Sequence, residues 1–420
     1  MNRPSSVRKR SNNEAIGAEL QPLSQVEYGP IVLGLGAFMD IEIRQHIPGE
    51  NVEEFIQAGM EVFKHDPTWV APLHFEMKNR LNPDKNPLFK RADVALFTAH
   101  QRGHIVGRCS ATVDREYLRV HQDDTGFFGF FDTVHDVDVA RALLDRACRW
   151  LKLRGMKRVF GPVSLYFNDE VGCLIDGFEY APNLMMAHSR RYQGALIEAC
   201  GCEKEKDLLC WKYDVTIPLP KRAIKAWEDL QRLPEVKLRS IDVNNLESEM
   251  KNVMEIYNDG WEGKWGMVPA LPDETKKIVQ DMKLIIDPDV AFIAEVDGQA
   301  AGMCITLPNL NEALVGLDGK LFNYGVPLGA ARLLWRLKVR HPKSTRLMML
   351  GLRKSIRQNV KRYGGLSAAM YVEVAKRGAA KGYQWGELSW TREDDAPINL
   401  GIRSMGAHLY KTYRVYKKAI

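Results

Sequence analysis

The sequence lacks any long apolar run. A membrane-spanning helix needs ~18–20 consecutive apolar residues, and the longest run near the start, IVLGLGAFM at residues 31–39, is far shorter. The sequence therefore predicts no transmembrane helix. The seven cysteines contain no C-x-x-C pair, which predicts neither a disulfide framework nor a zinc site. Reduced thiols in a cytoplasmic setting fit this pattern.

Several catalytic signatures are also missing. The chain contains no H-E-x-x-H, no phosphate-binding P-loop and no G-x-S-x-G. His100 and His104 flank an expected hairpin turn, so they do not share a helix face as a metal pair would. We therefore expect no metal cofactor.

The positive charge is unevenly distributed. Residues 330–420 hold 20 Lys and Arg against 5 Asp and Glu, a net charge of +15, which leaves 39 basic and 48 acidic residues elsewhere, a net charge of −9. A basic C-terminal segment on an otherwise acidic chain predicts an anionic partner for that segment. The candidates are nucleic acid, an anionic membrane and a phosphate-bearing cofactor.

Two stretches of the chain repeat one pattern. VALFTAHQRGHIVGRCSATVD (94–114) and AFIAEVDGQAAGMCITLP (291–308) each read as a β-hairpin, with a glycine in the turn and another four residues later. With the helical stretches around them, they indicate an internal duplication in a mixed α/β fold. We expect a disordered basic tail at 1–38, a first domain at 39–215, a linker helix at 216–235 and a second domain at 236–420.

A glycine turn in the second domain predicts an anion site. The apolar run RLMMLGL (346–352) is followed by KRYGGLSAAM (361–370), where a basic segment with Gly364 and Gly365 opens a helix. Free backbone amides and the helix dipole at such a start attract phosphate. Glycines that only bend the chain are the alternative.

This turn resembles the coenzyme A signature of the GNAT acyltransferase superfamily, Q/R-x-x-G-x-G/A, with Ser367 in the last position. The resemblance implies that acyl-CoA is the co-substrate. It also implies a set of CoA-binding residues: Gly351, Leu352, Arg353, Arg362, Gly364, Gly365, Leu366, Ser367 and Ala368. The first domain lacks the signature, so we expect two tandem GNAT-like domains of which the first is degenerate for CoA binding.

Three further segments narrow the resemblance. DPTWVAPLHFEMKNRLNPDKNPLF (66–89), NDEVGCLIDGF (168–178) and GELSWTREDD with MGAHLYKTYRVYKK (386–395, 405–418) are similar to a bacterial double-GNAT family that includes the bacterial ceramide synthases. The resemblance implies transfer of a fatty acyl group from acyl-CoA to the amine of a sphingoid base. Acetylation of a small polar amine or a protein is one alternative, and a non-catalytic acyl-CoA-binding protein is another. Nucleic-acid binding is disfavoured, because the basic excess falls on the CoA-like turn.

The resemblance also implies catalytic roles. A backbone N–H of Leu352 or Gly351 would polarise the thioester carbonyl, and Glu387 would act as the base. A solvated strand position is the alternative for Glu387. The superfamily's usual acid is a Tyr at the place of Ile402, so Tyr410, Tyr413 and Tyr416 are substitutes, with ordinary packing as their alternative.

The acceptor site is expected to draw on both domains. The residues are Asn168, Glu170, Asn258, Trp261, Trp265 and Trp390. A turn is the alternative for Asn168 and Glu170, and core or lid packing at i,i+4 spacing on one helix is the alternative for Trp261 and Trp265. The stretch LGAARLLWRLKVRHPK (328–343) predicts a basic amphipathic helix with Arg332, Arg336 and Arg340 in a row on one face. Such a helix fits peripheral contact with an anionic inner membrane, and packing on its own sheet is the alternative.

Overall fold

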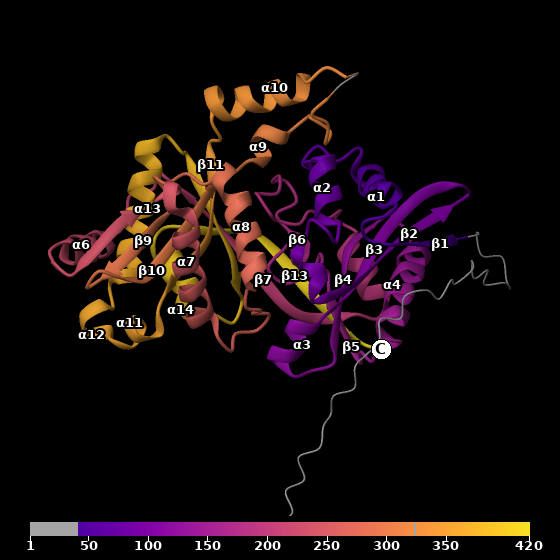
Figure 1. Ribbon diagram of the computed structural model, residues 1–420, viewed down its shortest axis with the longest axis horizontal. Helices are drawn as coiled ribbons and strands as arrows, with labels where there is room; N and C mark the ends of the chain where they lie inside the picture. The colour runs from indigo at the N-terminus through magenta and orange to yellow at the C-terminus, as the bar shows by residue number, and fades with distance from the viewer. Residues whose placement is uncertain (1–40, 323–324) are drawn as a thin grey trace, which may run out of the picture. The chain divides into compact units, whose positions relative to one another are not determined.

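One mixed sheet runs through the described part of the chain. The computed structural model describes residues 41–322 and 325–420, so the predicted tail at 1–38 lies outside the described residues. The sheet has thirteen strands in the order β1-β2-β3-β4-β5-β13-β7-β12-β11-β10-β9-β8, with β6 paired to β13 (Figure 1). The mixed α/β fold predicted from the sequence is confirmed.

The strands are β1 (Ile41–His46), β2 (Ala92–Gln101), β3 (His104–Asp114), β4 (Thr125–Thr133), β5 (Arg158–Gly161), β6 (Cys173–Asp176), β7 (Glu203–Asp214), β8 (Val236–Ser240), β9 (Phe292–Val296), β10 (Gln299–Pro308), β11 (Ser344–Leu352), β12 (Trp385–Arg392) and β13 (His408–Ala419).

The α-helices are α1 (Glu53–Phe63), α2 (His74–Arg80), α3 (Arg115–His121), α4 (Val137–Lys152), α5 (Gln193–Ala199), α6 (Lys221–Gln231), α7 (Leu246–Trp261), α8 (Pro272–Ile285), α9 (Asn311–Leu314), α10 (Leu328–Trp335), α11 (Lys354–Gln358), α12 (Val360–Tyr363), α13 (Leu366–Lys381) and α14 (Ala396–Ser404). Two short 3-10 helices, η1 (Pro87–Lys90) and η2 (Val243–Asn245), and a π-helical turn, η3 (Arg336–Arg340), complete the elements.

The two predicted hairpins have the same turn. Arg102 and Gly103 join β2 to β3, and Asp297 and Gly298 join β9 to β10, all four with positive φ. Positive φ at both central residues is the type I′ geometry, which matches the twist of the strands. The sequence pattern thus located both hairpins.

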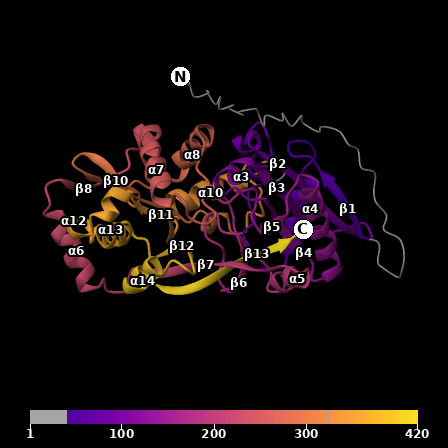
Figure 2. The same cartoon turned by 90° about the horizontal axis from the view of Figure 1, so that it is seen from below.

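The first half of the chain (residues 41–215) and the second half (residues 236–420) exchange their long last strands, β7 and β13. β7 comes from the first half, yet it pairs with β12 and β13 of the second half. β13 in turn pairs with β5 and β6 of the first half, and Figure 2 shows β7 and β13 running side by side. This exchange makes the sheet continuous across the boundary drawn from sequence at 215–236, and the division into domains stays a prediction.

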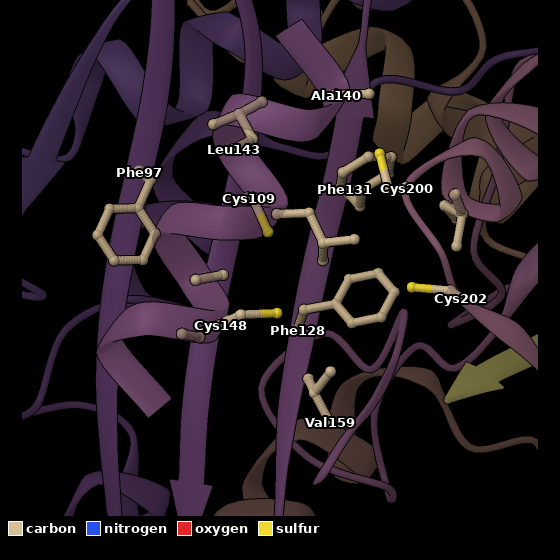
Figure 3. Packing of buried hydrophobic residues seen from close by; sticks show 14 of the residues in the cluster. Phe97, Cys109, Phe128, Phe131, Ala140, Leu143, Cys148, Val159, Cys200 and Cys202 are labelled. Atoms are coloured by element: carbon tan, nitrogen blue, oxygen red, sulfur yellow. The ribbon is translucent and has the colours of Figure 1, made fainter. Parts of the chain in front are cut away.

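Helices cover both faces of the sheet. In the second half, Phe292 and Cys304 pack under α13, whereas the alternating residues Ile293 and Met303 pack under α7. In the first half, α4 covers one face over a dense core of Phe97, Phe128, Phe131 and several cysteines (Figure 3). Within the described residues, no helix has the length and apolar character to cross a membrane.

Candidate functional site

A gap opens between β11 and β12. The parallel pairing of these strands ends at Leu347 and Leu388, while β11 continues to pair with β10 as far as Leu352. The amide of Arg353 donates to Ala301 O on the β10 side at 2.9 Å. Because successive amides of a strand point to opposite edges, the amide of Leu352 points into the gap.

Three β-bulges surround the closed end of this gap. On β11, Met349 pairs with Ile305 and Leu347 with Thr306, so Met348 is the extra residue. On β12 the register shifts between Leu388 and Thr391, and on β13 Tyr410 is the extra residue between Leu409 and Lys411. Bulges re-aim side chains and are enriched beside active sites, and here β11, β12 and β13 shift register at one level, with β7 lying between β12 and β13.

Glu387 lies fully buried at this level. Its carboxylate accepts a hydrogen bond from the Tyr410 hydroxyl and one of 2.5 Å from Ser389 Oγ. The Arg346 Nε donates to Ser389 Oγ at 2.9 Å and lies 3.8 Å from the Glu387 carboxylate. The predicted alternative of a solvated strand residue is therefore wrong for Glu387, because water does not reach it.

Burial shapes the ionisation of the cluster. It raises the pKa of Tyr410 far above the usual value, and the charge of Glu387 adds to this shift. Burial lowers the pKa of Lys411, whose Nζ donates to Ala181 O at 2.6 Å. Burial also raises the pKa of Tyr413, which senses the charges of both Glu387 and Glu170. The cluster thus holds a protonated phenol against a carboxyl group.

The N-terminus of α13 differs from that of its counterpart α4. Helix α4 is capped by Asp136, whose carboxylate accepts from the amides of Asp138 and Val139. Helix α13 begins after Gly365, with no side-chain cap and no acidic residue in its first turn. The first amides of α13, at Leu366, Ser367 and Ala368, thus retain the capacity to bind an anion.

The basic residues near the N-terminus of α13 form ion pairs with acidic side chains. Arg362 is exposed and donates to the Glu235 carboxylate, with 2.9 Å from its Nε. Arg353 donates to Ala300 O and, at 2.9 Å, to Glu255. Neither guanidinium is held against the first turn of α13, so the backbone amides are the stronger feature of this turn.

The glycines of the turn also have packing reasons. A Cβ on Gly364 would collide with Val360 O, and one on Gly351 would collide with the Trp261 ring. At Gly365 an added Cβ would come 3.2 Å from the Ala226 Cβ of α6. Close packing therefore accounts for part of the glycine pattern that the sequence had suggested was a phosphate site.

The two predicted acceptor residues of the first half have different partners. Asn168 accepts from the Tyr257 hydroxyl at 3.1 Å, and its amide donates to Val268 O at 3.1 Å. Glu170 accepts from Arg80 at 3.2 Å, and Asp169 bonds the same guanidinium. The structure thus brings Asn168 onto helix α7, whereas Glu170 is engaged in an ion pair.

The remaining predicted residues lie around the same junction. Trp261 stacks on Tyr257 with ring centroids 5.3 Å apart, and it is the last residue of α7. Trp265 lies beyond the helix end, so the expected shared helix with Trp261 is wrong. Trp265 packs against Phe167 at 5.0 Å, and Trp390 borders the same core cluster. Asn258 keeps a buried Oδ1 that receives no hydrogen bond from any described residue.

Sequence reasoning missed the loop that covers Glu387. Arg346 Nη1 donates to Leu184 O at 2.7 Å and to Met185 O at 3.2 Å, and Met186 contacts Ser389. This loop follows the NDEVGCLIDGF segment, but nothing local in the sequence shows that it crosses to β11. The role of Arg346 was not predicted either, because a single charged residue at the edge of an apolar run is typical of the end of a strand.

The chain was compared with known proteins. No protein-family model matches it. The bacterial ceramide synthase of Caulobacter vibrioides is 35% identical over 373 residues, which cover 88% of this chain and 95% of that protein. Protein YghO of Escherichia coli K12 is 34% identical over 379 residues, which cover 90% and 95%.

Two solved structures show the same fold. A tandem GNAT protein from the clavulanic acid biosynthesis pathway superposes with a TM-score of 0.51 at 11% identity, over 90% of this chain and 98% of that one. The GCN5-related glucosamine N-acetyltransferase region of a fungal multi-domain β-N-acetylglucosaminidase gives 0.53 at 12% identity, over 91% and 38%. Because both identities are low, these likenesses bear on the fold alone.

Proposed function

This chain belongs to the family of the bacterial ceramide synthase and is a tandem GNAT acyl-CoA-dependent N-acyltransferase, and from that premise we propose that its acyl acceptor is the amine of a long-chain sphingoid base. The observation that carries the acyl-transfer chemistry is the buried pair of Glu387 and Tyr410, beside the point where the pairing of β11 with β12 ends. An acid and a base are the groups that amide formation from a thioester requires.

We place the acyl-CoA along β11. The free edge of β11 beyond Leu347 offers amides to the pantetheine arm and the thioester, including those of Leu352 and of the bulge at Met348. The pyrophosphate would lie on the first turn of α13, where the dipole and free amides attract anions. The first half offers no equivalent, because Asp136 occupies the start of α4 and Val163 N bonds Phe128 O where the second gap would open.

The chemistry then divides between two side chains. The amine nitrogen attacks the thioester carbon, a C–N bond forms, and the amine proton passes to the Glu387 carboxylate. When the C–S bond breaks, Tyr410 gives its proton to the departing thiolate and regains one from Glu387. The raised pKa of Tyr410 keeps the phenol protonated until that step. No net proton is gained or lost by the protein.

We place the acceptor between the loop that carries Asn168 and helix α7. The buried, unpaired Oδ1 of Asn258 is a ready acceptor for an ammonium or hydroxyl proton. Trp261, Trp265 and Trp390 surround this region with apolar surface. A long-chain amine gains ~0.8 kcal/mol for each buried methylene, which a small polar amine cannot. Glu170, paired with Arg80, would fix the loop rather than bind substrate directly.

A membrane contact would suit such an acceptor. Residues 315–340 carry an apolar ridge of large side chains that are 49% to 64% exposed: Val315, Phe322, Val326, Leu328, Leu334, Trp335 and Val339. The exposed Lys320, Arg332, Lys338 and Arg340 flank them. Figure 1 shows α10 at the top of the view, above α9. Large exposed apolar patches mark interaction sites, and basic flanks favour an anionic bilayer.

Arg336 does not share in this ridge. Its Nη1 donates to Ala313 O at 2.8 Å and to Val315 O at 2.6 Å, which ties the π-helical turn to α9. The expected row of Arg332, Arg336 and Arg340 is therefore broken, since the middle residue turns inward. We propose that the outer residues of the ridge bind the bilayer from which the long-chain amine is taken.

The proposed function is tested by a thiol-release assay. Palmitoyl-CoA is offered with sphinganine, 3-ketosphinganine, spermidine or a lysine peptide, and each product is identified by mass. The proposal predicts amide formation with the two long-chain bases and little with the two polar amines. Efficient acylation of a polar amine, with no amide from a long-chain base, would overturn the proposed acceptor. The assignment as an N-acyltransferase would still stand.

A further inference from the structure

A hollow lies between α13 and the sheet. It has a volume of about 60 Å³, which is room for about four to five water-sized groups at the ~10–15 Å³ that each one needs. Its wall is predominantly apolar and is built from α13, from both gap strands and from the segment before β13. The residues that define it are Leu347, Tyr371, Val374, Gly378, Gly386 and Leu388.

Gly378 keeps this hollow open. It is buried in the last turn of α13, inside the helix, where glycine is disfavoured relative to alanine. A Cβ placed on Gly378 would meet no other atom within 4 Å. Close packing therefore does not explain the glycine, although it explains Gly351 and Gly365. The missing side chain instead leaves room in the wall.

The hollow adjoins the proposed reaction site. Leu347 and Leu388 are the last paired residues of β11 and β12, and both line the hollow. Their neighbours Arg346 and Glu387 face the opposite side of the sheet, toward Ser389 and Tyr410. A chain that enters through the gap thus has an apolar space on one face and the acid–base pair on the other.

The first half has side chains where the second half has space. Under α4, the aromatic rings of Phe97, Phe128 and Phe131 and the side chain of Leu143 interdigitate with the cysteines of the core (Figure 3). A Cβ on Gly126 of β4 would collide with Leu151 of α4. Helices α4 and α13 cover corresponding strands of the two halves. Side chains fill the space under α4, which is also the helix whose N-terminus is capped by Asp136.

We propose that the hollow under α13 receives the tail of the acyl chain of the acyl-CoA and so sets the chain length that the protein uses. The inference rests on the proposed acyltransferase function and adds to it the place of the tail. Glu387 borders the hollow, but most of the wall is apolar, so a polar ligand would lose its hydration with little compensation.

The test fills the hollow from Gly378. Gly378→Ala, Gly378→Leu and Gly378→Phe add increasing bulk, and Ala379→Phe adds the same ring to the neighbouring exposed position of α13. Rates of thiol release are measured with acetyl-, octanoyl- and palmitoyl-CoA at saturating acceptor. We expect kcat/KM for palmitoyl-CoA to fall about fourfold for each methylene excluded, while the acetyl-CoA value is retained. Ala379→Phe should match the wild type.

Measurements of binding distinguish a failure of this inference from a failure of the proposed function. The Kd values of CoA and palmitoyl-CoA are compared by calorimetry in each variant, after circular dichroism has shown a native fold. If Gly378→Phe binds palmitoyl-CoA no more tightly than CoA, while its affinity for CoA is unchanged, the tail site is supported even if no amine is acylated. An unchanged ratio of palmitoyl-CoA to CoA affinity in a folded Gly378→Phe overturns it, whatever the activity. Failure of all acyl transfer in the wild type would count against the function alone.

Discussion

Ser367→Asp tests whether the start of α13 binds phosphate. Ser367 is the second residue of the helix, half-buried, beside the uncapped Gly365. An acidic side chain there favours the helix by about 0.3–1 kcal/mol through its interaction with the dipole. The same charge would stand close to a bound pyrophosphate and oppose it. The substitution should therefore stabilise the free protein and weaken CoA binding.

The size of the second effect follows from Coulomb's law. Two unit charges about 5 Å apart interact by about 3 kcal/mol at an effective dielectric constant of about 20. Solvent and salt reduce this at a half-exposed helix start to about 1–2 kcal/mol, which is about a fivefold to thirtyfold loss of affinity. Raising the ionic strength should shrink the difference, because it screens the added charge.

The assay is calorimetric titration of CoA, together with thermal unfolding of the free protein. Ser367→Asn is the control, since it has nearly the same size as the aspartate and no charge. We expect Ser367→Asp to raise the melting temperature by at most about 3 °C and to bind CoA more weakly than Ser367→Asn. Equal CoA affinity in the two variants would refute a phosphate site at this turn, and the glycines would then serve packing alone.

Three other changes probe the chemistry and the surface. Glu387→Gln should lower kcat by about 10²–10⁴-fold with unchanged CoA binding, and a rate within threefold of wild type would remove Glu387 from the mechanism. Because burial raises the pKa of Tyr410, its phenol stays protonated well above pH 10, so wild-type kcat should show no falling limb between pH 8 and 10. Tyr410→Phe should lose rate across that range, and full activity would exclude it as the acid. Leu334→Glu with Trp335→Glu should abolish co-sedimentation with anionic vesicles, whereas Leu284→Glu, at an 86% exposed leucine of α8, should not; equal binding by both would exclude the ridge.

Much of the fold was readable because it depends on local signals. The hairpin at Asp297-Gly298 is fixed by two residues with positive φ, and helix α7 follows the apolar spacing from Leu246 to Trp261. These elements form wherever the turn chemistry and the periodicity agree.

The site was harder to predict because its contacts are distant in sequence. Glu387 could be identified by its place after the helix, but its burial depends on Tyr410 and on the loop at Leu184. The exchange of β7 and β13, which brings Tyr410 beside β12, has no local signature. Arg362 was predicted from a motif position as a phosphate ligand, and nothing in the sequence indicated that the distant Glu235 pairs with it; its role at the phosphate stays a prediction.

The most direct measurement is a single competition reaction. The protein receives equal concentrations of palmitoyl-CoA and acetyl-CoA with equal concentrations of sphinganine and spermidine, in the presence of anionic vesicles. The amides are then identified and quantified by mass, with Glu387→Gln as the background. The account predicts N-palmitoyl sphinganine as the main product, absent from the variant. Acetylated spermidine as the main product, or the same amides from the variant, would contradict it.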